Sequence, residues 1–112
     1  MKNKKQNNKG FASASKNQSP KNLQPDNTID HNTKEQKAIE LINKGRADEA
    51  IPIYKELAKS GSKNHIVHGN LGALLKKRGD TKNAIESLKI ALKLQPNYPE
   101  AHYNLGSALK EQ

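Results

Sequence analysis

The chain repeats itself through its second half at a spacing of about 34 residues. The matching positions are Gly45 and Gly79, Ala50 and Ala84, His68 and His102, Asn70 and Asn104, and Leu71-Gly72 and Leu105-Gly106. One unit of such a repeat cannot bury its apolar face alone, so it must stack on its neighbours. The repeat therefore predicts a stacked array that offers an extended surface for holding another molecule, and such a surface is not by itself a reaction centre.

The residues inside each repeat favour helices. Apolar side chains recur at helical spacing, as at Val67, Leu71 and Leu75, and no run of β-branched residues alternates in the manner of a strand. We expect five helices: from near Thr33 to Gly45, from about Asp48 to Lys59, at 64–77, at 81–94, and from Tyr98 or Pro99 to Gln112. The sequence thus predicts an all-α fold of antiparallel helical hairpins joined by short loops.

Cap and turn residues indicate where these helices begin and end. Thr33 and Gln36 have the spacing of a capping box, so order is expected to begin near Thr33. Gly45 and Gly79 are each expected to end a helix. Pro52 is placed near the start of the second helix, where its missing N–H costs least. The side chains expected to point inward are Ala38, Leu41, Ile42, Ala50, Ile51, Tyr54, Leu57, Ala58, Val67, Leu71, Leu74, Leu75, Ala84, Ile85, Leu88, Ala91, Leu92, Ala101, Leu105, Ala108 and Leu109.

Residues 1–32 have a different composition, rich in Lys, Asn, Ser, Gln and Pro and almost free of apolar residues. They cannot bury enough surface to offset the entropy of ordering, so we expect a disordered basic tail. Of the net charge of +9, residues 1–33 carry +4 and the helical part carries +5, partly at Lys76-Lys77-Arg78. Nucleic acid is nevertheless not the expected partner, because the tail offers no series of stacking aromatics or arginines.

Several classes of protein are disfavoured by what the sequence lacks. It contains no Cys, which excludes a disulfide framework and thiolate metal sites. No run approaches the ~18 apolar residues that a membrane span needs, and no apolar segment of a secretory signal follows the basic start. We therefore expect a cytoplasmic protein with no membrane association, and the many Lys and Asn residues suggest a bacterial source with an AT-rich genome.

Catalytic and metal-binding patterns are missing as well. His65 and His68 are three residues apart on one expected helix, but no third ligand falls on that face, and zinc sites use three or four. Gly69 and Gly72 lack the Lys-Ser/Thr ending of a phosphate-binding loop, and no base is placed near any serine. The sequence predicts no enzyme activity, no catalytic residue, no metal and no cofactor.

Residues 33–112 resemble the tetratricopeptide repeat family, most closely from residue 68 onward. The family pattern of a bulky residue, Leu-Gly, bulky, Gly, Ala, bulky, Ala and Pro reads here as His68, Leu71-Gly72, Leu75, Gly79, Ala84, Leu88, Ala91 and Pro96. The first unit matches less well, since it has Lys37-Ala38 in place of Leu-Gly. The resemblance implies a helical-hairpin solenoid with units at about 31–64 and 65–98 and a partial unit at 99–112.

The family generally binds an extended peptide in the groove lined by the first helix of each repeat. By register, the resemblance implies a groove lined by Glu35, Gln36, Ile39 and Asn43 in the first unit, by Asn70, Ala73, Lys76 and Lys77 in the second, and by Tyr103, Asn104, Ser107 and Glu111 in the third. Asn70 and Asn104 are the most informative, because an amide both donates and accepts and can pair with any peptide backbone. The family's carboxylate clamp for chaperone C-termini is not expected, because Glu35 and Glu100 would repel a carboxylate.

The sequence therefore predicts a non-catalytic interaction module whose partner is a protein or a peptide. Three alternatives stay open. The chain can be the N-terminal, substrate-presenting region of a larger glycosyltransferase or sulfotransferase, since similar bacterial repeats often precede such domains and Gly106 has no partner helix before Gln112. The tail can associate with nucleic acid, and the uncovered face of the last helix can mediate self-association.

Overall fold

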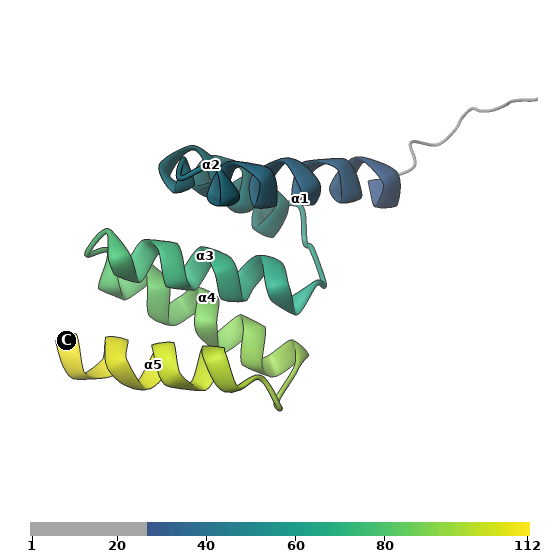
Figure 1. Cartoon of the computed structure of the whole chain (residues 1–112). Helices are drawn as coiled ribbons and strands as arrows, with labels where there is room; N and C mark the ends of the chain where they lie inside the picture. The colour runs from purple at the N-terminus through teal and green to yellow at the C-terminus, as the bar shows by residue number, and fades with distance from the viewer. Residues whose placement is uncertain (1–26) are drawn as a thin grey trace, which may run out of the picture. The chain divides into compact units, whose positions relative to one another are not determined.

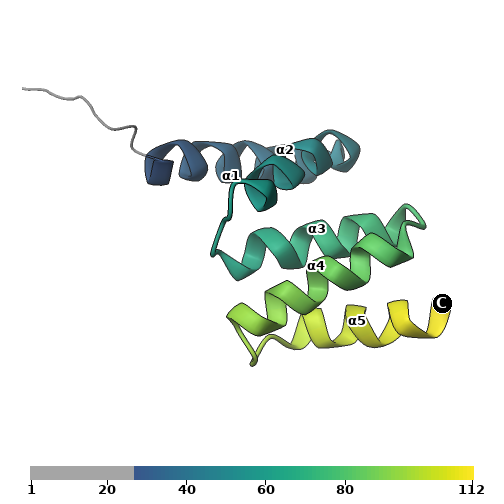
Figure 2. The same cartoon turned by 180° about the vertical axis from the view of Figure 1, so that it is seen from behind.

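The computed structural model describes residues 27–112, and these residues form five α-helices and no strand (Figure 1). The helices are α1 (Asn27–Asn43), α2 (Ala47–Lys59), α3 (His65–Lys77), α4 (Thr81–Leu94) and α5 (Pro99–Glu111). Figures 1 and 2 show α1, α3 and α5 on one face of the array and α2 and α4 on the other. The all-α prediction is confirmed; of the predicted tail, residues 1–26 lie outside the described residues.

The start of α1 differs from the prediction. The helix begins at Asn27, so Thr33 lies inside it and the Thr33–Gln36 pair does not cap it. Asp30 lies in the first turn, where the partial positive charge of a helix N-terminus favours a carboxylate. The predicted start relied on apolar residues, whereas the backbone hydrogen bonds of a helix do not require them.

The predicted glycine stops are confirmed at the ends of α1 and α3. Gly45 has a φ of 76° and Gly79 a φ of 88°, values that a residue with a side chain rarely adopts. Beyond Gly45 the backbone N–H of Arg46 donates to the carbonyl of Leu41 at 2.7 Å, which satisfies an otherwise orphaned helix carbonyl. These tight stops turn the chain back on itself and set up the hairpins.

Pro52 lies in the interior of α2 and not in its first turn, contrary to the prediction. A proline there leaves the carbonyl four residues earlier, that of Asp48, without its helical donor. Both Pro52 and Asp48 are exposed, so water can hydrogen-bond to that carbonyl. The position of the proline on the outer surface explains why the helix continues through it.

The hydrophobic core is continuous from α1 to α4, and a second cluster joins α4 to α5. The predicted inward residues that are buried are Ala38, Leu41, Ala50, Ile51, Tyr54, Leu57, Val67, Leu71, Leu75, Ala84, Ile85, Leu88, Ala91, Ala101 and Ala108. The prediction of an inward side chain is wrong for Leu109, which is 45% exposed because no described helix packs on its side of α5. Gly72 lies against Leu88 and the Ala84 carbonyl, so α3 and α4 approach closely there.

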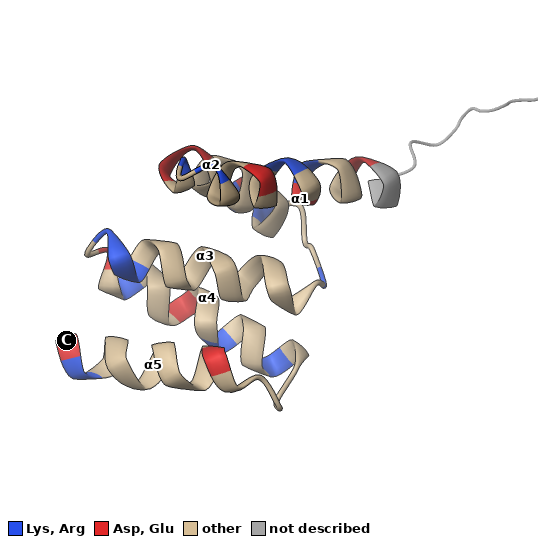
Figure 3. Ribbon diagram, viewed as in Figure 1, with Lys and Arg blue, Asp and Glu red and all other residues tan. Residues whose placement is uncertain are grey.

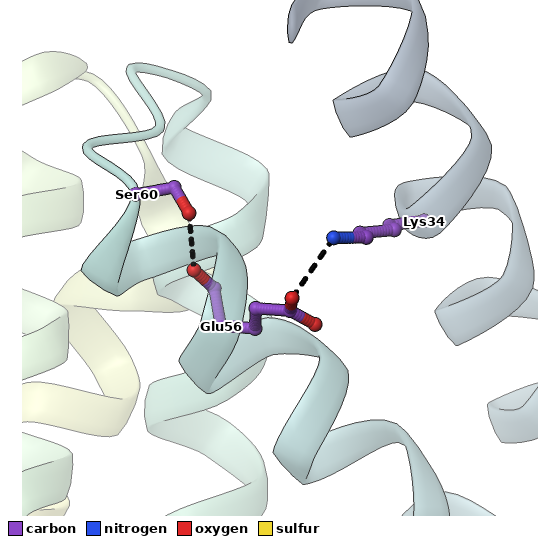
Figure 4. A network of polar contacts seen from close by, with 3 residues as sticks. All are labelled: Lys34, Glu56 and Ser60. Atoms are coloured by element: carbon purple, nitrogen blue, oxygen red, sulfur yellow. Dashed lines mark hydrogen bonds and ion pairs between the residues drawn. The ribbon is translucent and has the colours of Figure 1, made fainter.

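A polar contact on the outside of the core joins the first two helices. Lys34 Nζ of α1 lies 2.9 Å from Glu56 Oε2 of α2 (Figure 4). The Ser60 hydroxyl donates to the Glu56 carbonyl at 2.9 Å, one turn further along. Exposed pairs of this kind contribute little stability, so the packing of the helices depends on the apolar core.

Candidate functional site

A groove runs between α3 and α5, which lie side by side and point in the same direction (Figure 1). Near their N-termini the His65 ring meets the Tyr98 ring edge-on, with centroids 5.1 Å apart. Near their C-termini Lys76 Nζ lies 3.9 Å from Glu111 Oε2. The groove has a volume of about 440 Å³ and is lined by His65, Ile66, Gly69, Asn70, Ala73, Tyr98, Glu100, Ala101 and Asn104.

Tyr98 forms part of the groove wall by crossing from the α4–α5 loop onto α3. A Cβ built on Gly69 would lie 2.6 Å from Tyr98 Cε2, so the ring occupies the space that a side chain at residue 69 would need. Burial raises the pKa of the Tyr98 phenol, and the charges of Glu100 and Tyr54 raise it further. The phenol therefore stays neutral at physiological pH and can donate a hydrogen bond into the groove.

The side chain of Asn70 is held in place by a hydrogen bond to the buried phenol of Tyr54. Its amide nitrogen donates to the Tyr54 hydroxyl oxygen at 3.0 Å, and Tyr54 is only 1% exposed. Burial raises the pKa of Tyr54, the Asn70 hydrogen bond opposes this, and the charge of Glu35 adds to it. Because this bond uses one N–H of the Asn70 amide, the other N–H and the carbonyl oxygen can serve a guest.

The structure brings together some of the predicted site residues and separates others. Asn70, Ala73 and Asn104 all line the α3–α5 groove. Lys76 and Lys77 lie at the C-terminal end of α3, beyond that lining. Of these five predicted residues, three line the groove and two lie beyond one end of its lining.

The remaining predicted residues on α5 lie around a separate hollow. Tyr103 and Ser107 line a volume of about 380 Å³ together with His102, Gly106 and Lys110. Tyr103 is 76% exposed and does not line the groove shared with α3. This hollow is on the side of α5 that no described helix covers.

On α1 the predicted residues do not join the α3–α5 groove. The Glu35 carboxylate accepts a hydrogen bond at 3.0 Å from the side-chain amide of Asn64, the residue that caps α3. Gln36 and Ile39 are exposed on the same helix, and Ile39 is 39% exposed. The contact made by Glu35 ties α1 to the start of α3, which gives this carboxylate a structural role.

Sequence reasoning missed six residues of the groove: His65, Ile66, Gly69, Tyr98, Glu100 and Ala101. Gly69 carried a usable signal, because a glycine in the interior of a predicted helix often marks close approach of another group. Nothing in the sequence identified Tyr98 as that group. Its contact with Gly69 depends on how α5 packs against α3, which is a tertiary property.

Two histidines at equivalent repeat positions make the same hydrogen bond. The Nε2–H of His68 donates to the Ser62 carbonyl at 2.8 Å, and that of His102 donates to the Pro96 carbonyl at 2.8 Å. Each bond joins the first turns of a helix to the loop that precedes it. These imidazoles therefore position α3 and α5.

In residues 27–112 no group of three or more His, Asp or Glu side chains is arranged to hold a metal ion. None of the helices found there combines the length and the apolar character that crossing a bilayer requires. The predicted cytoplasmic location and bacterial source stay predictions.

Part of this chain matches a known protein family. The family model described as TPR repeat, the tetratricopeptide repeat, matches residues 72–112. The matched segment begins inside α3 and runs through α4 and α5, so it includes the second half of α3 and the Gly72 and Gly106 positions of the repeat. The repeat spacing, the antiparallel helical hairpins and this match over residues 72–112 together support a protein of the tetratricopeptide repeat family.

Proposed function

We propose that this chain is a non-catalytic interaction module that holds an extended peptide segment across α3 and α5. Tetratricopeptide repeats generally mediate protein–protein interaction. The observation that carries the proposal is a groove in which two neighbouring helices each supply an amide side chain at the same repeat position, Asn70 and Asn104. Such a pair recognises a backbone and not a reactive group.

Backbone recognition explains why amides are suited to this position. Packed helices lie about 8–10 Å apart, and an extended chain advances about 3.3 Å per residue, so amides on adjacent helices contact backbone groups about two or three residues apart. A step of two residues puts both contacts on the same edge of the guest strand. Tyr54 fixes the Asn70 amide in advance, which reduces the entropy lost on binding.

The test is a selection for displayed peptides followed by a side-chain deletion. Peptides of random sequence enriched on the immobilised protein are expected to bind about 5- to 150-fold more weakly to Asn70→Ala/Asn104→Ala, since each lost hydrogen bond contributes about 0.5–1.5 kcal/mol. Asn32→Ala is the matched control, because Asn32 is exposed on α1 and does not line the groove. Failure to enrich any peptide, or equal binding by the double variant, would overturn the proposal.

The three alternatives from the sequence stay predictions. A transferase-associated role, nucleic-acid association through the tail and self-association through α5 each gain no specific support from the described residues. A salt titration against mixed-sequence DNA tests the second, since phosphate contacts give a steep dependence on salt. Sedimentation at increasing concentration tests the third.

A further inference from the structure

Building on the proposed function, we propose that the α3–α5 groove selects an extended peptide whose side chains alternate in charge, with basic residues toward one end of the two helices and acidic residues toward the other. The recognised ligand class is thus a mixed-charge β-like segment. Neither a uniformly basic nor a uniformly acidic segment would satisfy both ends of the groove.

Charge is distributed unevenly along the parallel helices α3 and α5. Glu100 supplies the only carboxylate of the groove lining, and it lies in the first turn of α5. Lys76 and Lys77 lie in the last turn of α3, just beyond the residues that line the groove. Figure 3 shows the segments of α3 and α5 between these ends largely free of charge. Because α3 and α5 point the same way, like ends coincide and the groove has an acidic end and a basic end.

The charges of Glu100 and Lys77 are not neutralised by nearby described side chains. In the described part of the chain no ion pair forms at Glu100 or at Lys77. Lys76 meets Glu111 only at 3.9 Å, which leaves the basic end with an excess of positive charge. Lys63 is exposed in the loop before α3 and, like Lys76 and Lys77, lies outside the groove lining, in which Glu100 is the only charged residue among those described.

Helix dipoles oppose this arrangement without reversing it. Each helix terminus carries about half a charge, and its effect falls off within the first or last turn. At the start of α3 the Asn64 side chain already accepts from the backbone N–H of Ile66 at 3.0 Å. The full charge of Glu100, on a side chain that lines the groove, therefore dominates for a guest lying in it.

An extended peptide points its side chains in alternating directions. In a strand the backbone N–H and C=O groups point sideways, while successive side chains point to opposite faces. If one backbone edge pairs with Asn70 and Asn104, successive side chains point alternately toward the N-terminal and the C-terminal ends of α3 and α5. Glu100 then meets one set and Lys77 the other, so a strictly alternating guest satisfies both ends.

Two peptides of identical composition test the proposal. One alternates lysine and glutamate, and the other places all its lysines before all its glutamates; both are titrated against the full chain by NMR or fluorescence. The alternating peptide is expected to bind about two- to fivefold more tightly, as befits exposed ion pairs, and the difference is expected to shrink at high salt. Equal or weaker binding of the alternating peptide overturns the proposal.

Charge-removing variants locate the effect. Glu100→Gln and Lys77→Gln are each expected to reduce the preference for the alternating peptide, whereas Glu86→Gln and Lys89→Gln, exposed on α4 outside the groove lining, leave it unchanged. A preference that survives Glu100→Gln and Lys77→Gln together overturns the assignment. If display-selected peptides bind but neither charged peptide does, the charge inference fails and the proposed function stands; if no peptide binds at all, the proposed function fails and takes the inference with it.

Discussion

α3 and α5 carry the same repeat pattern but lie in different surroundings. Leu75 of α3 is 3% exposed, whereas its counterpart Leu109 of α5 is 45% exposed. A Cβ on Gly72 would lie 2.5 Å from Leu88 Cγ, whereas one on Gly106 would meet nothing within 4 Å. The difference arises because α4 packs on this face of α3, while no described helix packs on the same face of α5.

The local hydrogen bonds, by contrast, are the same in both helices. His68 and His102 each donate to a carbonyl six residues earlier at 2.8 Å, although His68 is buried and His102 is exposed. Each of these bonds spans only six residues, from the first turn of a helix to the loop before it, so it needs no second helix packed alongside. The burial of an apolar face, by contrast, needs another helix packed against it. Comparing α3 with α5 therefore distinguishes contacts set by neighbouring residues from contacts set by helix packing.

The largest expected difference concerns the paired leucines. Leu75→Ala should lower the free energy of unfolding by about 2–5 kcal/mol, because it leaves a cavity in the core. Leu109→Ala should cost less than about 1 kcal/mol, because Leu109 is half in water. Urea unfolding followed by circular dichroism measures both, and Leu75→Val keeps the comparison measurable if Leu75→Ala is already unfolded. Equal losses at the two positions would show that α5 is covered in solution.

The paired glycines should give effects of opposite sign. Gly72→Ala should destabilise the fold by about 1–3 kcal/mol, because the new Cβ clashes with the fully buried Leu88. Gly106→Ala should stabilise it by up to about 1 kcal/mol through helix propensity, since the space there is open. Thermal unfolding of the two variants gives the sign directly. A destabilised Gly106→Ala would contradict the open face.

A third pair compares Gly69 with its counterpart Tyr103. Gly69→Ala should lower the free energy of unfolding by about 1–2 kcal/mol, because it displaces the Tyr98 ring from α3. The same substitution in a Tyr98→Ala background should have little effect, which a double-mutant cycle measures. Tyr103→Ala, at a residue that is 76% exposed, is the control and should change stability by less than about 0.5 kcal/mol. Additive effects of Gly69→Ala and Tyr98→Ala would contradict the contact.

The smallest effect concerns the N-caps of α4 and α5. Hydrogen bonding from the Asn83 side chain lowers the pKa of Asp80 below its ordinary value of 3.8, whereas the cap residue of α5, Tyr98, makes no side-chain cap bond. A carboxyl whose folded-state pKa is lowered stabilises the fold at pH values above its unfolded pKa, and this contribution is lost as pH falls through the folded pKa.

Asp80→Asn should therefore flatten the dependence of the melting temperature on pH below about pH 4. The measurement is a series of thermal melts between pH 2 and pH 6. Glu49, whose pKa is lowered by its hydrogen bond to Arg46, contributes to the same window, so Glu49→Gln serves as the matched comparison. An unchanged acid slope in Asp80→Asn would rule out the cap as its source.

The sequence predicted well wherever the determining contacts are local or repeat with the period of the chain. The stops at Gly45 and Gly79 follow from the left-handed backbone that each adopts. It predicted poorly where a helix continues without apolar support, as at Asn27, or carries a proline on its outer surface, as at Pro52. At Pro52 the exposed surface leaves the unpaired carbonyl of Asp48 open to water.

The candidate site shows the same division. Register alone assigned Asn70, Ala73 and Asn104, and all three line the α3–α5 groove. Register also grouped Tyr103 and Ser107 with them, but these residues lie around the separate hollow on α5. Gly69 and Ala73 of α3 face α5, so their repeat counterparts Tyr103 and Ser107 lie on the face of α5 turned away from α3.

The amino-acid sequence by itself determined the helices, the glycine stops and the repeat that makes α3 equivalent to α5, because these depend on backbone conformation and on the period of apolar residues. Only the tertiary structure decided that Tyr98 covers Gly69, that Tyr54 holds Asn70, and that Leu75 is buried while Leu109 is exposed. The physical reason is that burial and side-chain contact belong to pairs of elements. Identical residues acquire different environments when only one of them has a helix packed against it.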